Sequence, residues 1–200
     1  MSHWRKQQQR DPYFRQAKQE GYRARSAYKL LQLQERFRIV RHGDTVVDLG
    51  AAPGSWSQVA VKLVGAKGRV VALDLQEIEV IPGVITLQGD MTDPATQAQV
   101  VEAAGGQANV IVSDAAPSTS GIKLRDHALS MELTRAALTL AQTLLIPGGH
   151  MVVKVFEGPD LQDVLQEYKA AFRSARISAP KASRKESRET FIIAQKYKGS

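Results

Sequence analysis

Short apolar runs, separated by polar and glycine-rich segments, recur through the middle of the chain. Runs of this length, most of them rich in Val and Ile, are typical of buried strands. We therefore predict seven strands, at Thr45–Val47, Arg69–Leu73, Val84–Gln88, Asn109–Ser113, His150–Phe156, Arg176–Ser178 and Thr190–Gln195.

Between these runs, apolar residues recur every three or four positions, which is the spacing of one face of a helix. The pattern predicts helices at Ala27–Phe37, from about Gln58 to Val64, and at Pro94–Ala104, Asp126–Leu145 and 160–173. Ser57 is the predicted cap of the second helix. The predicted inner face of the fourth helix consists of Leu129, Leu133, Ala137, Leu140 and Leu144.

Strands and helices alternate along the chain, as in an α/β fold with a mostly parallel sheet and right-handed crossovers. The last two predicted strands have no helix between them, so we expect one of seven strands to run antiparallel near the sheet edge. The expected architecture is Rossmann-like, with helices on both faces of the sheet. Residues 21–200 are expected to form this single domain, behind a basic and mobile extension at 1–20.

The 200-residue chain contains no cysteine, which excludes disulfides, thiolate metal sites and cysteine catalysis. The four histidines are scattered, so no metal site is expected. No apolar run approaches the ~20 residues of a membrane span, and the first residues lack the apolar core of a signal peptide. From the sequence we expect a soluble, cytoplasmic monomer.

Positive charge is concentrated at the two ends of the sequence. The net charge is +8 over residues 1–41, −7 over 42–172 and +6 over 173–200, within a total of +7. This segregation is typical of a surface that follows nucleic-acid phosphates, although two solvated tails would look the same. Arg23, Arg25 and Lys29 lie at helical or near-helical spacing and are the candidate RNA contacts.

Acidic residues follow the first four predicted strands. Asp48, Asp74, Asp90 and Asp114 each stand at or just after the carboxyl end of one run, and Gly50 opens a turn of small residues after the first. Ligands of open α/β sheets bind at the carboxyl ends of the strands. We therefore expect the four carboxylates to face one crevice.

The turn after the first strand is not that of a dinucleotide enzyme. Ala52 stands where the second Gly of Gly-x-Gly-x-x-Gly would lie, and no P-loop sequence occurs. Asp48, just before the first Gly, suits a cationic ligand better than a pyrophosphate. With Asp74 for ribose hydroxyls and Asp90 for an adenine amino group, the pocket is suited to S-adenosylmethionine.

Six segments carry a resemblance to a known family: Arg25–Leu30, Val47–Gln58, Leu87–Asp90, Ser113–Gly121, Val152–Phe156 and Ser187–Ala194. In these segments the chain resembles the FtsJ-like family of RNA ribose 2′-O-methyltransferases, especially the heat-shock type that modifies large-subunit ribosomal RNA. The resemblance implies a class I S-adenosylmethionine-dependent methyltransferase fold. The family's catalytic residues match Lys29, Asp114, Lys154 and Glu189. Its cofactor residues match Gly54, Trp56, Asp74, Asp90 and Asp114, with Asp48 and Gly50 nearby.

The expected chemistry centres on Lys154, which lies in an apolar strand. Burial favours the neutral form of a lysine amine, which can then take a proton from a ribose 2′-hydroxyl. Asp114 would orient that amine, Glu189 would orient the amine or the hydroxyl, and Lys29 would hold the substrate. Two alternatives stay open: Lys154 could protect an edge strand, and Glu186 is the rival of Glu189.

By resemblance, the expected substrate is a uridine in the peptidyl-transferase region of large-subunit rRNA, free or in the assembled subunit. Transfer RNA and mRNA caps, the substrates of other family members, are alternatives. A protein or small-molecule methyltransferase and a non-enzymatic RNA-binding domain with an inactive pocket are further ones.

Overall fold

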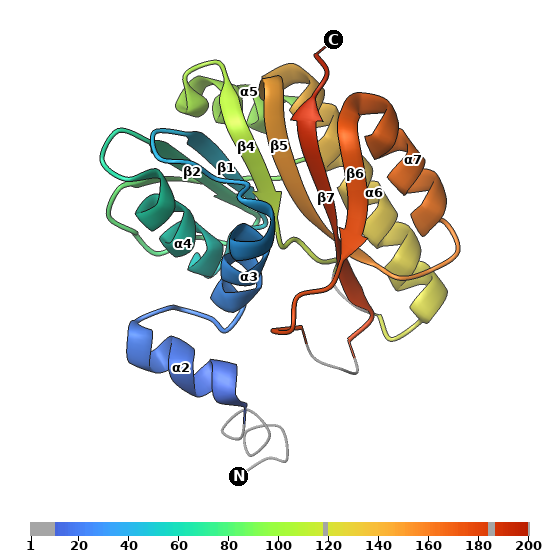
Figure 1. The fold of residues 1–200 in the computed structure, drawn as a ribbon, viewed down its shortest axis with the longest axis horizontal. Helices are drawn as coiled ribbons and strands as arrows, with labels where there is room; N and C mark the ends of the chain where they lie inside the picture. Colours follow the sequence, from blue (N-terminus) through green and yellow to red (C-terminus); the bar gives the residue numbers. More distant parts are fainter. Residues whose placement is uncertain (1–10, 118–119, 184–186, 200) are drawn as a thin grey trace.

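A central sheet lies between two layers of helices in the computed structural model, which describes residues 11–117, 120–183 and 187–199 (Figure 1). The strand order is β3-β2-β1-β4-β5-β7-β6. The strands are β1 (Thr45–Leu49), β2 (Arg69–Asp74), β3 (Val84–Gln88), β4 (Ala108–Ser113), β5 (Leu145–Phe156), β6 (Phe172–Ser178) and β7 (Glu189–Tyr197).

One strand runs against the others, as predicted. β7 pairs antiparallel with both β5 and β6, whereas the remaining pairs are parallel. The order reverses at β1, which has β2 on one side and β4 on the other. Such a reversal opens a crevice at the carboxyl ends of the strands, where α/β proteins bind ligands.

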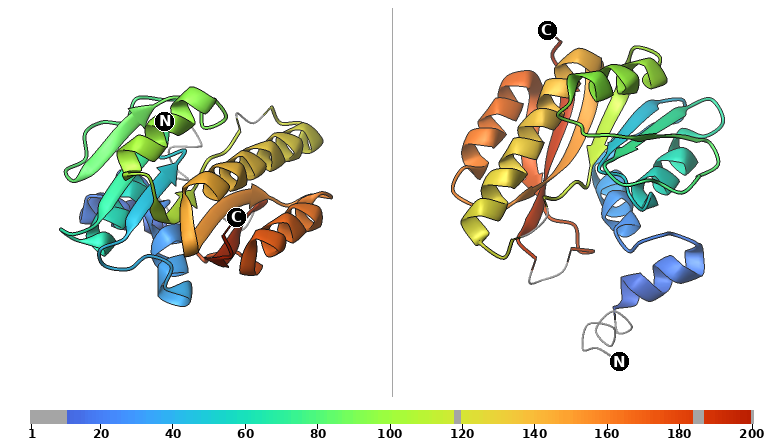
Figure 2. Two further views of the ribbon diagram at one scale, coloured as in Figure 1. Left: turned by 90° about the horizontal axis from the view of Figure 1, so that it is seen from above. Right: turned by 180° about the vertical axis from the view of Figure 1, so that it is seen from behind.

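Helices cover both faces of the sheet (Figures 1 and 2). They are α3 (Ala27–Phe37), α4 (Ser55–Val64), α5 (Pro94–Ala104), α6 (Lys123–Leu144) and α7 (Leu161–Ala171), whereas α2 (Pro12–Glu20) lies beyond the end of the sheet (Figure 1). The buried clusters place α3 and α4 on one face and α5, α6 and α7 on the other.

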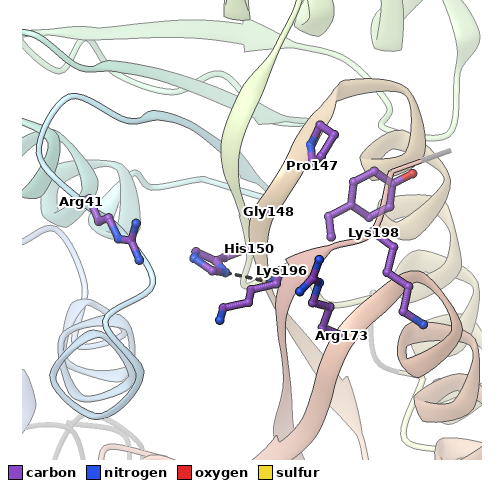
Figure 3. Close-up of a pocket in the computed structure, with 8 residues that line it drawn as sticks. Arg41, Pro147, Gly148, His150, Arg173, Lys196 and Lys198 are labelled. Atoms are coloured by element: carbon purple, nitrogen blue, oxygen red, sulfur yellow. Dashed lines mark hydrogen bonds between the residues drawn. The ribbon is translucent and has the colours of Figure 1, made fainter.

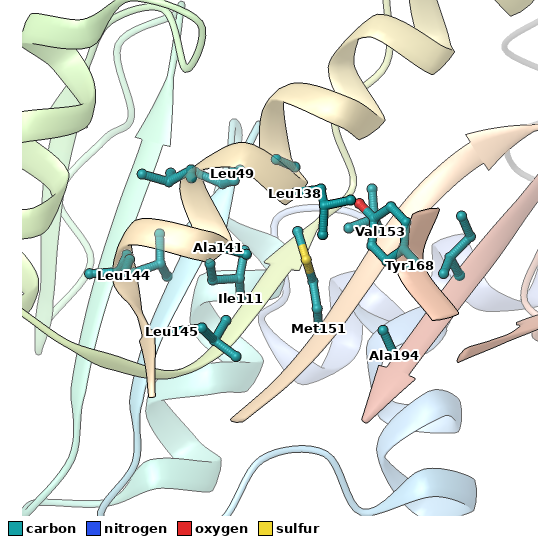
Figure 4. Packing of buried hydrophobic residues seen from close by; sticks show 14 of the residues in the cluster. Leu49, Ile111, Leu138, Ala141, Leu144, Leu145, Met151, Val153, Tyr168 and Ala194 are labelled. Carbon is teal, nitrogen blue, oxygen red and sulfur yellow. The ribbon is translucent and has the colours of Figure 1, made fainter. Parts of the chain in front are cut away.

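Two-residue alternation along the strands explains why both faces are apolar. Val46 and Val110 pack with α3 and α4, whereas their neighbours Val47 and Ile111 pack with the helices of the opposite face. Figure 4 shows this second cluster, in which Met151 and Val153 of β5 meet Leu138 of α6 and Tyr168 of α7.

Helix α2 was not predicted from the sequence. Asp11 caps it by accepting hydrogen bonds from the N–H groups of Tyr13 and Phe14, Pro12 occupies the first turn, and Gly21 ends it. Its buried residue, Ala17, belongs to a small cluster with Tyr28 and Ala182. The expected extension at 1–20 therefore contains an ordered helix from Pro12, while residues 1–10 lie outside the described part of the chain.

Helix α4 begins earlier than predicted, and its cap differs. The helix starts at Ser55, and its N-cap residue is Gly54, with a φ of 106°. Ser57, the predicted cap, instead donates a hydrogen bond to Asp48 Oδ2 at 2.6 Å. The prediction was wrong because a buried carboxylate requires the hydroxyl more than a helix end does.

The inner face of α6 is only partly the predicted one. Ala137, Leu140 and Leu144 are buried, together with Met131, Leu138 and Ala141. Leu129 and Leu133 are only half-buried because they line the cavity at the strand ends. In the described part of the chain, no helix is both long and apolar enough to cross a membrane.

Candidate active site

A cavity of about 590 Å³ opens at the carboxyl ends of β1 to β4, and we call it the strand-end cavity. Its volume falls within the range of small-molecule sites, about 300 to 1,000 Å³. Gly50, Asp74, Asp90 and Asp114 line it, as predicted from their places after the strands. Glu132 adds a fourth carboxylate to the wall and Arg125 a cation, so the lining residues carry net negative charge.

Asp48 lies beneath the cavity and does not line it. The fourth residue of β1, it has no solvent exposure, and its Oδ1 has no hydrogen-bond partner. Burial raises the pKa of Asp48 to about 7; the charges of Asp114 and Asp74 also raise it, while the hydrogen bond from Ser57 lowers it. A buried carboxylate with an unused oxygen favours a cationic ligand nearby.

Gly50 allows the loops after β1 and β4 to meet where the strand order reverses. Its φ is 70°, and a Cβ placed there would lie 2.5 Å from Ala115 Cβ and 2.6 Å from Ala115 Cα. Any side chain would therefore separate the two loops.

Asp74 and Asp90 hold the loops of the cavity wall. The carboxylate of Asp74 accepts hydrogen bonds from the N–H groups of Ala52 and Gln76, both at 2.9 Å. Asp90 Oδ1 accepts from the N–H and hydroxyl groups of Thr92, at 2.8 and 2.7 Å.

Gly54 and Trp56, also predicted as cofactor residues, are not among the residues that line the cavity. A Cβ at Gly54 would lie 2.4 Å from Ile81 Cδ1. Trp56 is buried, stacks on Phe191 with ring centroids 5.7 Å apart, and donates a hydrogen bond to Ser26 O at 2.8 Å. In the structure, these two residues join α4 to its neighbours.

The four predicted catalytic residues are brought together beside the cavity. Lys154 Nζ lies 3.2 Å from Asp114 Oδ1 and donates a hydrogen bond to the backbone O of Asp114. Lys29 Nζ lies 2.6 Å from Glu189 Oε1 and 3.8 Å from Asp114 Oδ1. Two cations thus share one carboxylate, and all four side chains are at least four-fifths buried.

Different elements supply each member of this group. Lys29 lies in the first turn of α3, Asp114 follows β4, Lys154 is in β5 and Glu189 begins β7. β5 is paired on both sides, which excludes protection of an edge strand as the role of Lys154. The rival carboxylate Glu186 lies outside the described residues.

Glu189 is held ionised by its neighbours. Burial alone would raise its pKa, but the positive charge of Lys29, a hydrogen bond from Lys29 and the positive charge of Lys154 together lower it. A carboxylate of this kind accepts hydrogen bonds and does not store a proton. It also offsets the charge of Lys29 at a helix N-terminus, where a cation is otherwise unfavourable.

Two of the three predicted RNA contacts make structural bonds. Arg23 donates hydrogen bonds to the carbonyl oxygens of Pro53, Glu79 and Val80, at 2.8, 2.8 and 3.0 Å. Arg25 contacts the Asp11 carboxylate and the Ala182 carbonyl.

Lys29 lines a smaller cavity of about 250 Å³ with Arg25, Ser26, Ala182, Ser187 and Glu189. This opening gives access to the Lys29–Glu189 pair from the side of α3.

Sequence reasoning missed the contribution of α6 and of the loop before it. Arg125, Leu129, Glu132 and Leu133 line the strand-end cavity. Leu129 and Leu133 were expected only to pack against the sheet, and no local pattern distinguishes Arg125 and Glu132 from solvent-facing residues. No group of residues that could hold a metal occurs within the described residues.

Comparison with known proteins identifies the family. A model of the FtsJ-like methyltransferases matches residues 22–197. The chain is 54% identical over 188 residues to ribosomal RNA large subunit methyltransferase E of Methanothrix thermoacetophila, covering 94% of this chain and 73% of that protein. It is 43% identical to the protein of the same name from Methanothermobacter thermautotrophicus, covering 98% and 94%.

Solved structures agree with the sequence relatives. A Plasmodium falciparum protein assigned as a ribosomal RNA methyltransferase superposes with a TM-score of 0.81 at 26% identity, over 90% of this chain and 100% of that one. A Clostridium thermocellum protein with 21% identity shares the fold, with a TM-score of 0.59 over 84% and 96%. The family match spans the strand-end cavity and all four residues of the Lys–Asp–Lys–Glu group, and the chain therefore belongs to the FtsJ-like methyltransferase family.

Proposed function

We propose that the protein transfers a methyl group from S-adenosylmethionine to a ribose 2′-hydroxyl of large-subunit ribosomal RNA. The observation that carries the proposal is the ion pair between Lys154 and Asp114, 3.2 Å apart, beside an acidic cavity. The names of the relatives favour ribosomal RNA over transfer RNA or an mRNA cap as the substrate. We place this activity in the cytoplasm and assign it to the monomer.

The residues of the strand-end cavity fit S-adenosylmethionine. The cofactor is cationic at its amino group and its sulfonium, and the lining residues are net acidic. Asp48, two residues before Gly50, provides a buried oxygen that has no hydrogen-bond partner among the described residues. Asp74 and Asp90, at neighbouring strand ends, are suited to the ribose hydroxyls and the adenine amino group. When bound, the cofactor supplies a methyl group activated by the sulfonium.

The protein must then position one hydroxyl and remove its proton. In this proposal the Lys154 amine, in its neutral form, accepts the proton from the 2′-hydroxyl. The Asp114 carboxylate stabilises the resulting ammonium, and its backbone carbonyl fixes the direction of the amine. Lys29 and Glu189 together present a donor and an acceptor to the ribose. Orientation of this kind can contribute much of the rate enhancement.

The test is methyl transfer from labelled S-adenosylmethionine to total RNA and, in parallel, to protein, followed by mapping of the modified nucleotide. Lys154→Ala should lower kcat by about 10²- to 10⁴-fold, with cofactor binding retained as proof of folding. Lys154→Arg is the sharper variant, because a guanidinium keeps the charge but cannot act as a base. Label in protein and not in RNA, or full activity of the Arg variant, would contradict the proposal.

A further inference from the structure

A second cavity, of about 380 Å³, opens at the end of the strands opposite the strand-end cavity, where β5 begins and β7 ends. We call it the β5–β7 cavity. It is lined by Arg41, Pro147, Gly148, His150, Arg173, Lys196, Tyr197 and Lys198. Figure 3 shows Arg41 reaching in from one side, with His150, Lys196 and Arg173 on the other. Four separate chain segments thus bring basic groups to one opening.

Three of these cations have no carboxylate partner among the residues that the structure describes. Arg41, Arg173 and Lys196 are exposed, and none forms an ion pair with any residue in the described ranges. Asp44 is the nearby acid, and it accepts a hydrogen bond from the backbone N–H of Arg41. Lys198 differs, since its amine donates to the carbonyls of Lys169 and Ala170 at the end of α7, at 3.0 and 2.7 Å.

His150 adds a neutral donor to this group. It is nine-tenths buried, and its Nδ1 accepts a hydrogen bond from the backbone N–H of Lys196 at 3.2 Å. The neutral ring must therefore carry its proton on Nε2. Burial lowers the pKa of His150, and the charges of Arg41 and Lys196 lower it further, against an opposing effect of Asp44. A donor imidazole among unpaired cations is the chemistry of a phosphate site.

Basic residues also lie along β6, from the β5–β7 cavity toward the end of the sheet that carries Lys29 and Glu189. β6 is the last strand of the sheet and carries the exposed Arg173 and Arg176. Arg176 and Arg36 of α3 both lie against the ring of Phe37, at 5.9 and 5.0 Å. Arg36 also donates to Ser178 Oγ at 3.3 Å, where β6 ends. The chain after β6 leads to Ala182, beside Lys29 and Glu189.

We propose that the RNA strand bound at the active site also runs along β6 and places a backbone phosphate in the β5–β7 cavity. This inference rests on the proposed function, because it takes RNA as the substrate. His150 and Lys154 lie four residues apart on β5, about 13 Å at roughly 3.3 Å per residue. A few nucleotides of RNA can therefore reach from the target ribose at Lys154 to a phosphate site at His150.

The test compares RNA binding by single and combined variants of the full chain. Arg173→Gln and Lys196→Asn each remove one charge, and Asn tolerates the φ of 60° at Lys196. Lys67→Gln is the matched control, since it removes an exposed cation that lines neither the strand-end cavity nor the β5–β7 cavity, from the turn between α4 and β2. Dissociation constants for a large-subunit rRNA transcript are measured across a range of salt concentrations.

The double variant should bind the transcript roughly tenfold more weakly at moderate salt. The slope of log K against log salt should fall by about one per cation removed. The KM for RNA should rise in proportion, with cofactor affinity unaltered and Lys67→Gln close to wild type. Thermal unfolding of each variant confirms that it is folded.

Titration with inorganic phosphate, followed by NMR through the ring signals of His150, tests whether the cavity binds a free anion instead of an RNA phosphate. If phosphate shifts these signals while RNA affinity and salt slope match the control, the cavity binds a small anion and the proposal is wrong. An unchanged salt slope with no response to phosphate also refutes it. Methyl transfer by the wild-type protein is read separately, so failure of the proposed function is distinguished from failure of this inference.

Discussion

At the scale of single residues, Asp48 is a fully buried carboxyl group two residues before Gly50, which lines the strand-end cavity. Its pKa is about 7 in the folded protein, against an ordinary value of 3.8. Between these values the folded state holds a proton that the unfolded chain has released, so stability falls as pH rises through the interval. The cause is burial, and one oxygen remains without a partner.

Asp48→Asn should therefore be increasingly more stable than the wild type as pH rises from 4 to 8. The amide stays neutral throughout and can still accept the hydrogen bond from Ser57. Thermal unfolding of both proteins across this range measures the effect. The same variant should bind S-adenosylmethionine more weakly, by calorimetry, because it lacks the negative charge. A constant difference in unfolding temperature across the range would refute the assigned pKa shift.

The sequence indicated the residues that line the strand-end cavity, but it did not indicate the intramolecular contacts of the basic residues near the start of the chain. Asp74, Asp90 and Asp114 line the cavity because each follows a parallel strand, and the ends of such strands meet at one edge. Arg23 and Arg25 were assigned to RNA from their charge. Their partners lie up to 157 residues away in sequence, so no local pattern could indicate these contacts.

At the scale of elements, the turn between β1 and α4 depends on close approach at Gly50. Gly50→Ala introduces both a clash with Ala115 and a strained backbone. Gly106→Ala is the matched control, since Gly106 has a φ of 88° and open space around it. The control should cost about 1 to 2 kcal/mol for the left-handed backbone. Gly50→Ala should cost about 1 to 3 kcal/mol more and weaken cofactor binding. Equal losses in urea unfolding would show that the loops after β1 and β4 can separate freely.

Arg23 holds the loop between β2 and β3 against the turn after β1. Its guanidinium bonds to three carbonyls there, and Leu75 and Gln76 of the same loop line the strand-end cavity. Arg23→Gln and Arg23→Lys should both raise the Kd for S-adenosylmethionine several-fold, since an ammonium cannot reproduce the planar fork.

Neither Arg23 variant should change the salt slope of RNA binding. If Arg23 instead contacts phosphates, Arg23→Lys would keep most of the RNA affinity while Arg23→Gln would lose it, with cofactor binding intact. Measuring both ligands for both variants decides between these two roles.

Helix α2 shows how composition obscured a local signal. The capping residue Asp11, Pro12 in the first turn and Gly21 at the end are all helix boundary signals. The Gln- and Arg-rich stretch suggested mobility instead, and the helix buries only Ala17. In contrast, the bounds of α3 and α5 were predicted closely, α3 from its apolar spacing and α5 from Pro94 at its start and Gly105 after its end.

At the scale of the whole molecule, alternation along the chain predicted the class of fold and the single antiparallel strand. It did not predict that β7 inserts between β5 and β6, since sheet order is set by long-range pairing. That insertion has a functional consequence. It places Glu189 opposite Phe156 at one end of β7 and Lys196 beside His150 at the other.

The segregation of charge along the chain also needs a test at this scale. Removing residues 1–25 would confuse two effects, because it deletes α2, Arg23 and Arg25 together with the basic start of the chain. Removing only residues 1–10 takes away Arg5, Lys6 and Arg10 and no acidic residue. If these cations contact phosphates, the shortened protein should bind RNA more weakly, and its salt slope should fall by up to about 3. Its unfolding temperature and its affinity for S-adenosylmethionine should match the intact chain. An unchanged salt slope would confine the RNA-binding charge to residues 11–200, which include β6 and the β5–β7 cavity.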